Sequence, residues 1–305
     1  MDTNRSQKML VTTASVVIIV IVAVSFWHSP NPGEADKLNV VATFYPLAYF
    51  AEELGGEYVS VLQLIPHNTE VHSWQPSISG IVAVDEADIV IYNGADLDNW
   101  FETDILPSIN QGNKIIVDST EGVELLEADG LLDPHTWISP YVAKQQAQRI
   151  HLALIQKDPE HKQYYDQRWQ DLKAKFEQLD NDYVTGLSNV QKDVIFVTHA
   201  AFGYLAARYG FEQHGVIGLS ADEQPGASVI ADLVDMMLNH TTYVVYVDPV
   251  YSDEYAQALK DTLDSKTGQS AQILNLYFML GPVEDMDYFE QQESNLNNLK
   301  LGLEA

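Results

Sequence analysis

The chain has 305 residues, enough for two compact lobes, and its 44 acidic against 16 basic residues give a formal charge of −28. This charge excludes a nucleic-acid-binding protein, which needs a basic surface to neutralise phosphates, and it disfavours electrostatic docking on anionic lipid. Because 46% of the residues are hydrophobic, the chain is not a disordered acidic polymer.

Cysteine is absent from the chain. The sequence therefore offers no disulfide, no thiolate nucleophile, no cysteine metal ligand and no cysteine for a lipid anchor. Any site for a transition metal must use histidine together with carboxylate or water.

The first predicted element is the uncharged apolar segment Met9–Trp27, which follows Arg5 and Lys8. At helical rise it is about 28 Å long, close to the thickness of the hydrocarbon layer. The basic flank on its N-terminal side predicts that the rest of the chain lies outside the cell. We therefore expect a transmembrane signal anchor over residues 1–27, a cell-membrane location, and a polar linker over residues 28–37.

A cleaved signal peptide is the alternative for this segment, and it would leave a periplasmic or secreted protein. After Ala23 the chain continues with Phe26, Trp27 and His28, which do not fit a cleavage site made of small residues. We therefore favour the uncleaved anchor.

Short β-rich segments recur along the rest of the chain and alternate with helical patterns. The predicted strands are Val40–Thr43, Val59–Ile65, Ile89–Tyr92, Ile115–Asp118, Val194–Thr198, Val244–Asp248 and Ile273–Leu276. The predicted helices between them include Pro46–Leu54, Ala200–Tyr209 and Val229–Leu238. Nearly continuous apolar strands separated by helices are typical of parallel sheets covered on both faces, so the fold class is α/β.

The middle of the chain has no strand signal between Pro159 and Leu187. Large apolar residues recur there at alternating steps of four and three: Tyr165, Trp169, Leu172, Phe176, Leu179 and Tyr183. This spacing predicts one long amphipathic helix. We therefore expect an N-terminal lobe over residues 38–158, a linking helix over 159–188 and a C-terminal lobe over 189–305.

Three of the nine histidines stand where α/β folds hold ligands, in loops beyond the carboxyl ends of strands. His72 lies in the loop IPHNTEVHSWQPS, which also contains His67 as a competing candidate. His135 lies in LLDPHTWISP, where two prolines constrain the backbone. His199 ends the strand VIFVTH. Each of them, taken alone, could be a histidine with a structural role only.

Three imidazoles on three such loops would make a plausible metal site. Imidazole suits zinc, copper, nickel and iron, whereas carboxylate and water suit manganese and magnesium. Zinc would need a fourth ligand, either carboxylate or water. A ligating histidine commonly donates its other N–H to a carboxylate, and Glu70 and Asp133 are nearby candidates for this role.

Several of these segments together resemble the solute-binding proteins of zinc and manganese ABC transporters, the cluster A-I family of the zinc-uptake type. The resemblance covers about residues 38–300 in order. It is carried by VVATFYPLAYFAEELGGEYVSVLQLIPHNTEVHSWQPS, ADIVIYNGADLDNW, DPHTWISP and FVTHAAFGYLAARYGFEQHGVIGLSADEQPGAS. It implies two α/β lobes with parallel sheets joined by one long backbone helix.

The resemblance also implies metal-binding imidazoles at His72, His135 and His199, and so decides against His67. Histidine rather than glutamate at the third position points to Zn²⁺ over Mn²⁺. The histidine-rich loop of the family is missing between the first two ligands. The family pattern fails at the fourth ligand, because the last strand continues as ILNLYFMLGPVED; we place Glu284 first, with Asp285, Glu70 or water as alternatives.

The predicted function is thus extracytoplasmic zinc binding and delivery of the ion to an ABC import permease. We expect no enzymatic activity and a monomeric protein. Two alternatives stay open at this point: a zinc-dependent hydrolase, since three histidines and a water also describe a catalytic zinc, and a cell-surface adhesion protein that binds metal for stability. The chain has no HExxH motif to support the first.

Overall fold

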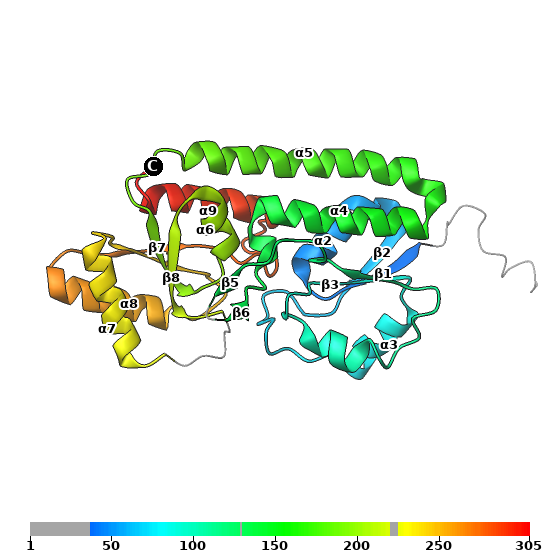
Figure 1. The fold of residues 1–305 in the computed structure, drawn as a ribbon, viewed down its shortest axis with the longest axis horizontal. Helices are drawn as coiled ribbons and strands as arrows, with labels where there is room; N and C mark the ends of the chain where they lie inside the picture. Colours follow the sequence, from blue (N-terminus) through cyan, green and yellow to red (C-terminus); the bar gives the residue numbers. More distant parts are fainter. Residues whose placement is uncertain (1–36, 129, 220–224) are drawn as a thin grey trace, which may run out of the picture. The chain divides into compact units, whose positions relative to one another are not determined.

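The computed structural model describes residues 37–128, 130–219 and 225–305 (Figure 1). The anchor predicted over residues 1–27 and nearly all of the linker predicted over residues 28–37 lie outside this part of the chain. In the part that is described, no helix combines the length and the apolar character needed to cross a membrane.

The first lobe is built on a four-stranded parallel sheet. Its strands are β1 (Leu38–Ala42), β2 (Val59–Gln63), β3 (Ile89–Tyr92) and β4 (Ile115–Asp118), in the order β2-β1-β3-β4. Helices α2 (Tyr45–Gly55) and α3 (Ile78–Glu86) follow the first two strands, and a short π-helical turn, Phe101–Ile105, precedes β4. β3 is buried at all four positions, as expected for a central parallel strand.

The second lobe repeats this design. Its strands are β7 (Val194–His199), β8 (Glu212–Ile217), β9 (Val244–Val247) and β10 (Gln272–Asn275), all parallel in the order β10-β9-β7-β8. Helices α6 (Gly203–Tyr209), α7 (Ala227–Asn239) and α8 (Glu254–Thr267) lie between them in the sequence. A two-stranded hairpin, β5 (Glu127–Ala128) and β6 (Leu131–Leu132), precedes the His135 loop.

Helix α5 (Lys162–Gly186) spans both lobes, with α4 (Pro140–Lys157) beside one part of it and α9 (Tyr288–Gly302) beside another (Figure 1). Asp158 begins the turn into α5, where its carboxylate accepts a hydrogen bond from the backbone N–H of His161. One part of α5 packs on α4 and α2, and another packs on α9. Its buried residues are the six apolar residues that predicted the helix.

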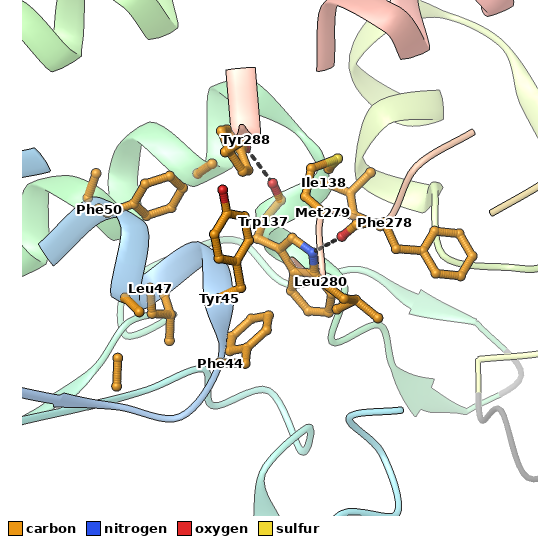
Figure 2. Packing of buried hydrophobic residues seen from close by; sticks show 14 of the residues in the cluster. Phe44, Tyr45, Leu47, Phe50, Trp137, Ile138, Phe278, Met279, Leu280 and Tyr288 are labelled. Atoms are coloured by element: carbon orange, nitrogen blue, oxygen red, sulfur yellow. Dashed lines mark hydrogen bonds between the residues drawn. The ribbon is translucent and has the colours of Figure 1, made fainter. Parts of the chain in front are cut away.

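The apolar interior extends across both lobes. A single cluster of buried side chains includes residues of the first sheet, of α2, α4 and α5, of β7, and of the segment 276–280. Figure 2 shows its centre, where the Trp137 indole lies among side chains from both lobes. A smaller cluster joins the second sheet to α7 and α8. Because the larger core is shared, moving one lobe against the other would disturb packed side chains.

The prediction of two α/β lobes with parallel sheets is confirmed, and each predicted strand has a counterpart within two residues at either end. β8 was not predicted. Its residues, EQHGVI, are mostly half-exposed at the sheet edge and include a glycine, so the apolar signal is weak. Helix α4 was also not predicted separately. Its sequence, PYVAKQQAQRIHLALIQK, mixes polar and apolar residues, and its buried face includes polar side chains, so the apolar pattern is weak.

Candidate metal centre

His135 is held by the loop between β6 and α4. The short turn Thr136–Ile138 follows it, and its side chain is 2% exposed. One carboxylate oxygen of Asp133 accepts a hydrogen bond from the His135 backbone N–H at 2.9 Å and lies 2.8 Å from the ring Nδ1. Burial raises the pKa of Asp133 to about 7, opposed by the hydrogen bond from the His135 backbone. When Asp133 is ionised it can only accept, so Nδ1 carries the proton and Nε2 presents its lone pair.

His199 reaches the site from the other lobe. It is the last residue of β7, where it pairs with Ile217 of β8, and β7 lies inside the second sheet. Its imidazole packs against the Phe278 ring, with 5.5 Å between the ring centroids. The position of this ring is therefore set by strand pairing and aromatic packing.

His72 comes from the loop between β2 and α3. Its side chain is less buried than those of the other two histidines. Its backbone N–H donates to Glu70 Oε1 at 2.9 Å, which makes a tight turn within the loop. The loop has no regular secondary structure around His72, so local contacts rather than a strand or helix place this imidazole.

The three imidazoles converge. His135 Nε2 is 3.2 Å from His72 Nε2 and 3.1 Å from His199 Nε2, and the three candidate ligand atoms all lie within 4.8 Å of one another. Zinc held tetrahedrally by nitrogens at about 2.0–2.1 Å requires nitrogen–nitrogen separations of about 3.3 Å. The two measured separations are close to this value.

Burial keeps the imidazoles of His135 and His199 neutral. It lowers the pKa of His135 well below 6.5, with a further contribution from His72. Burial also lowers the pKa of His199 well below 6.5. The neighbouring His135 and His72 lower it further, and a hydrogen bond with the Gly218 backbone opposes the shift. A neutral imidazole has the lone pair that a metal ion needs, so both rings can act as ligands at pH 7.

Other residues singled out from the sequence lie elsewhere or act differently. His67 packs edge-on to Tyr45, at 5.3 Å between ring centroids, and is not one of the three grouped imidazoles. Glu284 does not join them either. It is exposed, at a φ of 51° in the turn where Val283 pairs with Met286, and it is not among the residues whose ligand atoms lie within 4.8 Å of one another. The site considered below therefore does not include Glu284.

Glu70 bridges the two lobes beside the site. Besides accepting from the His72 backbone, its carboxylate forms a hydrogen bond with Tyr251. Glu70, Tyr251, His199 and Phe278 line a cavity of about 160 Å³. On another side, His72 borders a cavity of about 220 Å³ lined largely by aliphatic residues.

A second link between the lobes was not foreseen from the sequence. The Trp137 indole N–H donates to the Phe278 carbonyl at 2.7 Å, and the Tyr288 hydroxyl donates to the Trp137 carbonyl at 2.6 Å (Figure 2). Trp137 follows His135 by two residues, and the Phe278 ring contacts His199. The only sequence signal was the tryptophan beside a candidate ligand, and nothing in the sequence identified Phe278 as its partner.

Two parallel α/β lobes, joined by a long helix and each contributing imidazoles to one cluster, define the class of metal-binding solute-binding proteins. Residues 40–302 match the family described as zinc-uptake complex component A, periplasmic, and the chain belongs to this family.

Named relatives and solved structures agree with this membership. The chain is 29% identical to the high-affinity zinc uptake system protein ZnuA of Bacillus subtilis over 96% of both chains. It is 28% identical to the zinc-binding lipoprotein AdcA of Streptococcus pneumoniae, of which it spans 60%. The metal-dependent lipoprotein YcdH of B. subtilis has a similar structure, with a TM-score of 0.77 and 31% identity over 88% of this chain and 100% of that one.

Proposed function

We propose that this chain is the extracytoplasmic zinc-binding component of an ABC importer, and that its cargo is Zn²⁺ held by His72, His135 and His199. The observation that carries the proposal is the convergence of three Nε2 atoms, with separations of 3.2 and 3.1 Å from His135 to the other two. Two loops of one lobe and a strand end of the other supply them, as a carrier that holds an ion between its lobes requires.

The donor set favours zinc over manganese. Three imidazoles are nitrogen ligands, which suit zinc, whereas manganese prefers oxygen. The separations from His135 also fit the short bonds of tetrahedral zinc. The names of the B. subtilis and S. pneumoniae relatives support the same ion. Asp133 would orient His135, and Glu70 or water would complete the coordination.

Delivery would require a permease and only a small movement of the lobes. Helix α5 contacts helices of both halves, and a shared core lies beneath it. A large hinge rotation would break these contacts, so release through loops that rearrange on docking is the simpler route. The segment 1–27 would anchor the chain, because no cysteine is present to carry a lipid.

Metal analysis and calorimetric titration test the proposal. The full chain, purified in detergent and stripped with a chelator, is titrated with Zn²⁺ and separately with Mn²⁺. We expect one zinc ion per chain, weaker manganese binding, and loss of zinc binding in His199→Ala. The matched control is His240→Ala, because the His240 side chain is 40% exposed and lies outside the cluster. Equal zinc binding by both variants would contradict the proposal.

Two simple measurements separate the alternatives. A zinc hydrolase would turn over esters or peptides when loaded with zinc, whereas a carrier would not. A protein that uses metal for its fold would unfold when the metal is removed, whereas a carrier must stay folded when empty. Circular dichroism before and after chelation makes the second distinction.

A further inference from the structure

A group of buried polar side chains lies where β3 and α4 meet, next to the loop that carries His135. Each member is at most 4% exposed: Thr43, Asn93, Asp98, Ser119, Thr136 and Gln146. Buried polar groups that bond one another strongly favour one geometry, because any displacement leaves a donor or acceptor unpaired in a medium of low polarity.

Asn93 is at the centre of this network. Its Nδ2 donates to the Pro134 carbonyl at 2.9 Å and to the Gly94 carbonyl at 3.0 Å. Its Oδ1 accepts from Gln146 Nε2 at 3.1 Å and from the Thr136 hydroxyl at 3.3 Å. Pro134 and Thr136 are the two neighbours of His135 in the chain, so one amide contacts the residue on each side of the imidazole.

The Asn93 backbone is itself held in place by Asp98. The carboxylate of Asp98 accepts from the Asn93 N–H at 2.7 Å, from the Gly94 N–H at 2.9 Å and from the Thr43 hydroxyl at 2.8 Å. Gly94 has a φ of 81°, and a Cβ at this position would lie 2.3 Å from Asp118 Oδ1. This turn therefore requires glycine, and the Asn93 side chain extends from a constrained backbone.

We propose that Asn93 is a positioning residue for the metal centre, whose amide holds Pro134 and Thr136 and thereby sets the direction of the His135 imidazole. This inference rests on the proposed function, since it assigns Asn93 a role in how tightly the same three imidazoles hold zinc. Asn93 does not touch the ion; it acts through the backbone on either side of one ligand.

The need for such positioning follows from the geometry. His135 Nε2 lies close to both of the other Nε2 atoms, 3.2 Å from that of His72 and 3.1 Å from that of His199. Asp133 controls the ring through Nδ1, but Asp133 belongs to the same loop and moves with it. The bonds from Asn93 connect that loop to the first sheet, so they hold the ring in place relative to the rest of the lobe.

The test compares Asn93→Ala with Ser119→Ala in the full chain. Ser119 belongs to the same network, donating to the Asn93 carbonyl at 3.1 Å and accepting from Gln146 at 2.8 Å, and neither bond goes to the His135 loop. Zinc affinity is measured by competition with a chromophoric chelator, coordination geometry by the visible absorption of bound Co²⁺, and stability by the Tm of the metal-free chain.

We expect Asn93→Ala to weaken zinc binding about tenfold, at the lower end of the effect of outer ligand partners, and to alter the Co²⁺ spectrum. Ser119→Ala should lower the Tm while leaving the affinity and the spectrum as in the parent. Parental affinity and spectrum in Asn93→Ala would overturn the inference, since a merely structural role would change only the Tm.

Thr136→Val keeps the proposal falsifiable if Asn93→Ala does not fold. It removes the hydroxyl that donates to Asn93 Oδ1 at 3.3 Å and that also lies 3.5 Å from the Pro134 carbonyl. We expect roughly threefold weaker zinc binding from the loss of this buried hydrogen bond. Unchanged affinity in Thr136→Val would then overturn the inference. If the parent chain does not bind zinc, the proposed function itself is refuted. If the parent binds zinc and the variants bind it equally well, only the role of Asn93 is refuted.

Discussion

The two lobes share one sheet design but hold their imidazoles by different means. In the first lobe, His135 stands on an irregular loop that Asp133 braces from within and that the Asn93 amide connects to the end of β3. In the second lobe, His199 is part of a strand, so backbone pairing and contact with Phe278 place its ring. Side-chain hydrogen bonds therefore position the ligand on the loop, whereas backbone hydrogen bonds to neighbouring strands position the ligand on the strand.

His72 represents a third, looser case. Its loop is tied within itself through Glu70, and its side chain borders a cavity of about 220 Å³. The comparison therefore ranks the ligands: two imidazoles are built into the lobes and one is attached more loosely. We therefore expect the two imidazoles built into the lobes to contribute more to the zinc affinity than the loosely attached one.

The largest effect on zinc affinity is expected when His135→Ala is compared with His72→Ala. His135→Ala should weaken zinc binding well beyond about 100-fold, the upper range for outer partners of a ligand, because it removes the central and most buried donor. His72→Ala should cost less, since water can replace a half-buried imidazole. Competition with a chelator measures both. An equal or larger loss in His72→Ala would refute the ranking.

Each lobe has a buried carboxyl group, Asp98 in the first and Asp248 in the second, that should make stability depend on pH. Burial raises the pKa of Asp98 to about 6, opposed by hydrogen bonds from Asn93, Gly94 and Thr43. The folded chain therefore holds more protons than the unfolded chain between about pH 4 and 6. The contribution of Asp98 to the free energy of unfolding therefore falls as the pH rises, by about 2 kcal/mol between pH 4.5 and 7, and levels off above about pH 7.

Urea unfolding of the metal-free parent and of Asp98→Asn at pH 4.5 and 7 measures this contribution. The difference in stability between parent and variant should shrink towards pH 7. Burial also raises the pKa of Asp248 in the second lobe to about 6, so Asp248→Asn should show the same sign. Parallel pH profiles of parent and variant would show that Asp98 is ionised throughout.

Removing the carboxylate beside His135 should have an intermediate effect. Asp133→Ala leaves the ring Nδ1 without its acceptor and frees the backbone N–H of His135. We expect zinc affinity to fall about 10- to 100-fold. Asp133→Asn is the matched control, because its amide oxygen can still accept both bonds, and its loss should be smaller. Equal losses in the two variants would indicate that the charge, and not the orientation, is what matters.

The hydrogen bond that links the two lobes should affect stability rather than zinc binding. Trp137→Phe removes the donor to the buried Phe278 carbonyl and should lower the free energy of unfolding by about 1–3 kcal/mol beyond the loss of packing. Trp100→Phe is the control, since the Trp100 indole N–H is buried and has no hydrogen-bond partner among the residues described. Urea denaturation compares them. Equal losses would mean that the bond from Trp137 contributes nothing.

Local sequence patterns were enough to predict much of the fold. The four-and-three spacing from Tyr165 to Tyr183 predicted α5, because a helix with one buried face must repeat its apolar residues at that interval. Buried parallel strands such as β3 were equally clear. The edge strand β8 was not, because its half-exposed residues carry little apolar signal.

The chemistry of the site was determined by the sequence alone: histidines at the ends of strands, no cysteine, and a resemblance to a known family over about residues 38–300. The resemblance implied His72, His135 and His199, and the tertiary structure groups these three imidazoles. Only the tertiary structure decided that Glu284 is not one of this group and that Asn93, Phe278 and Tyr251 surround the site. The physical reason is that residue type and local spacing determine which atoms can bind a metal. Distances between residues far apart in the chain depend on how the elements pack.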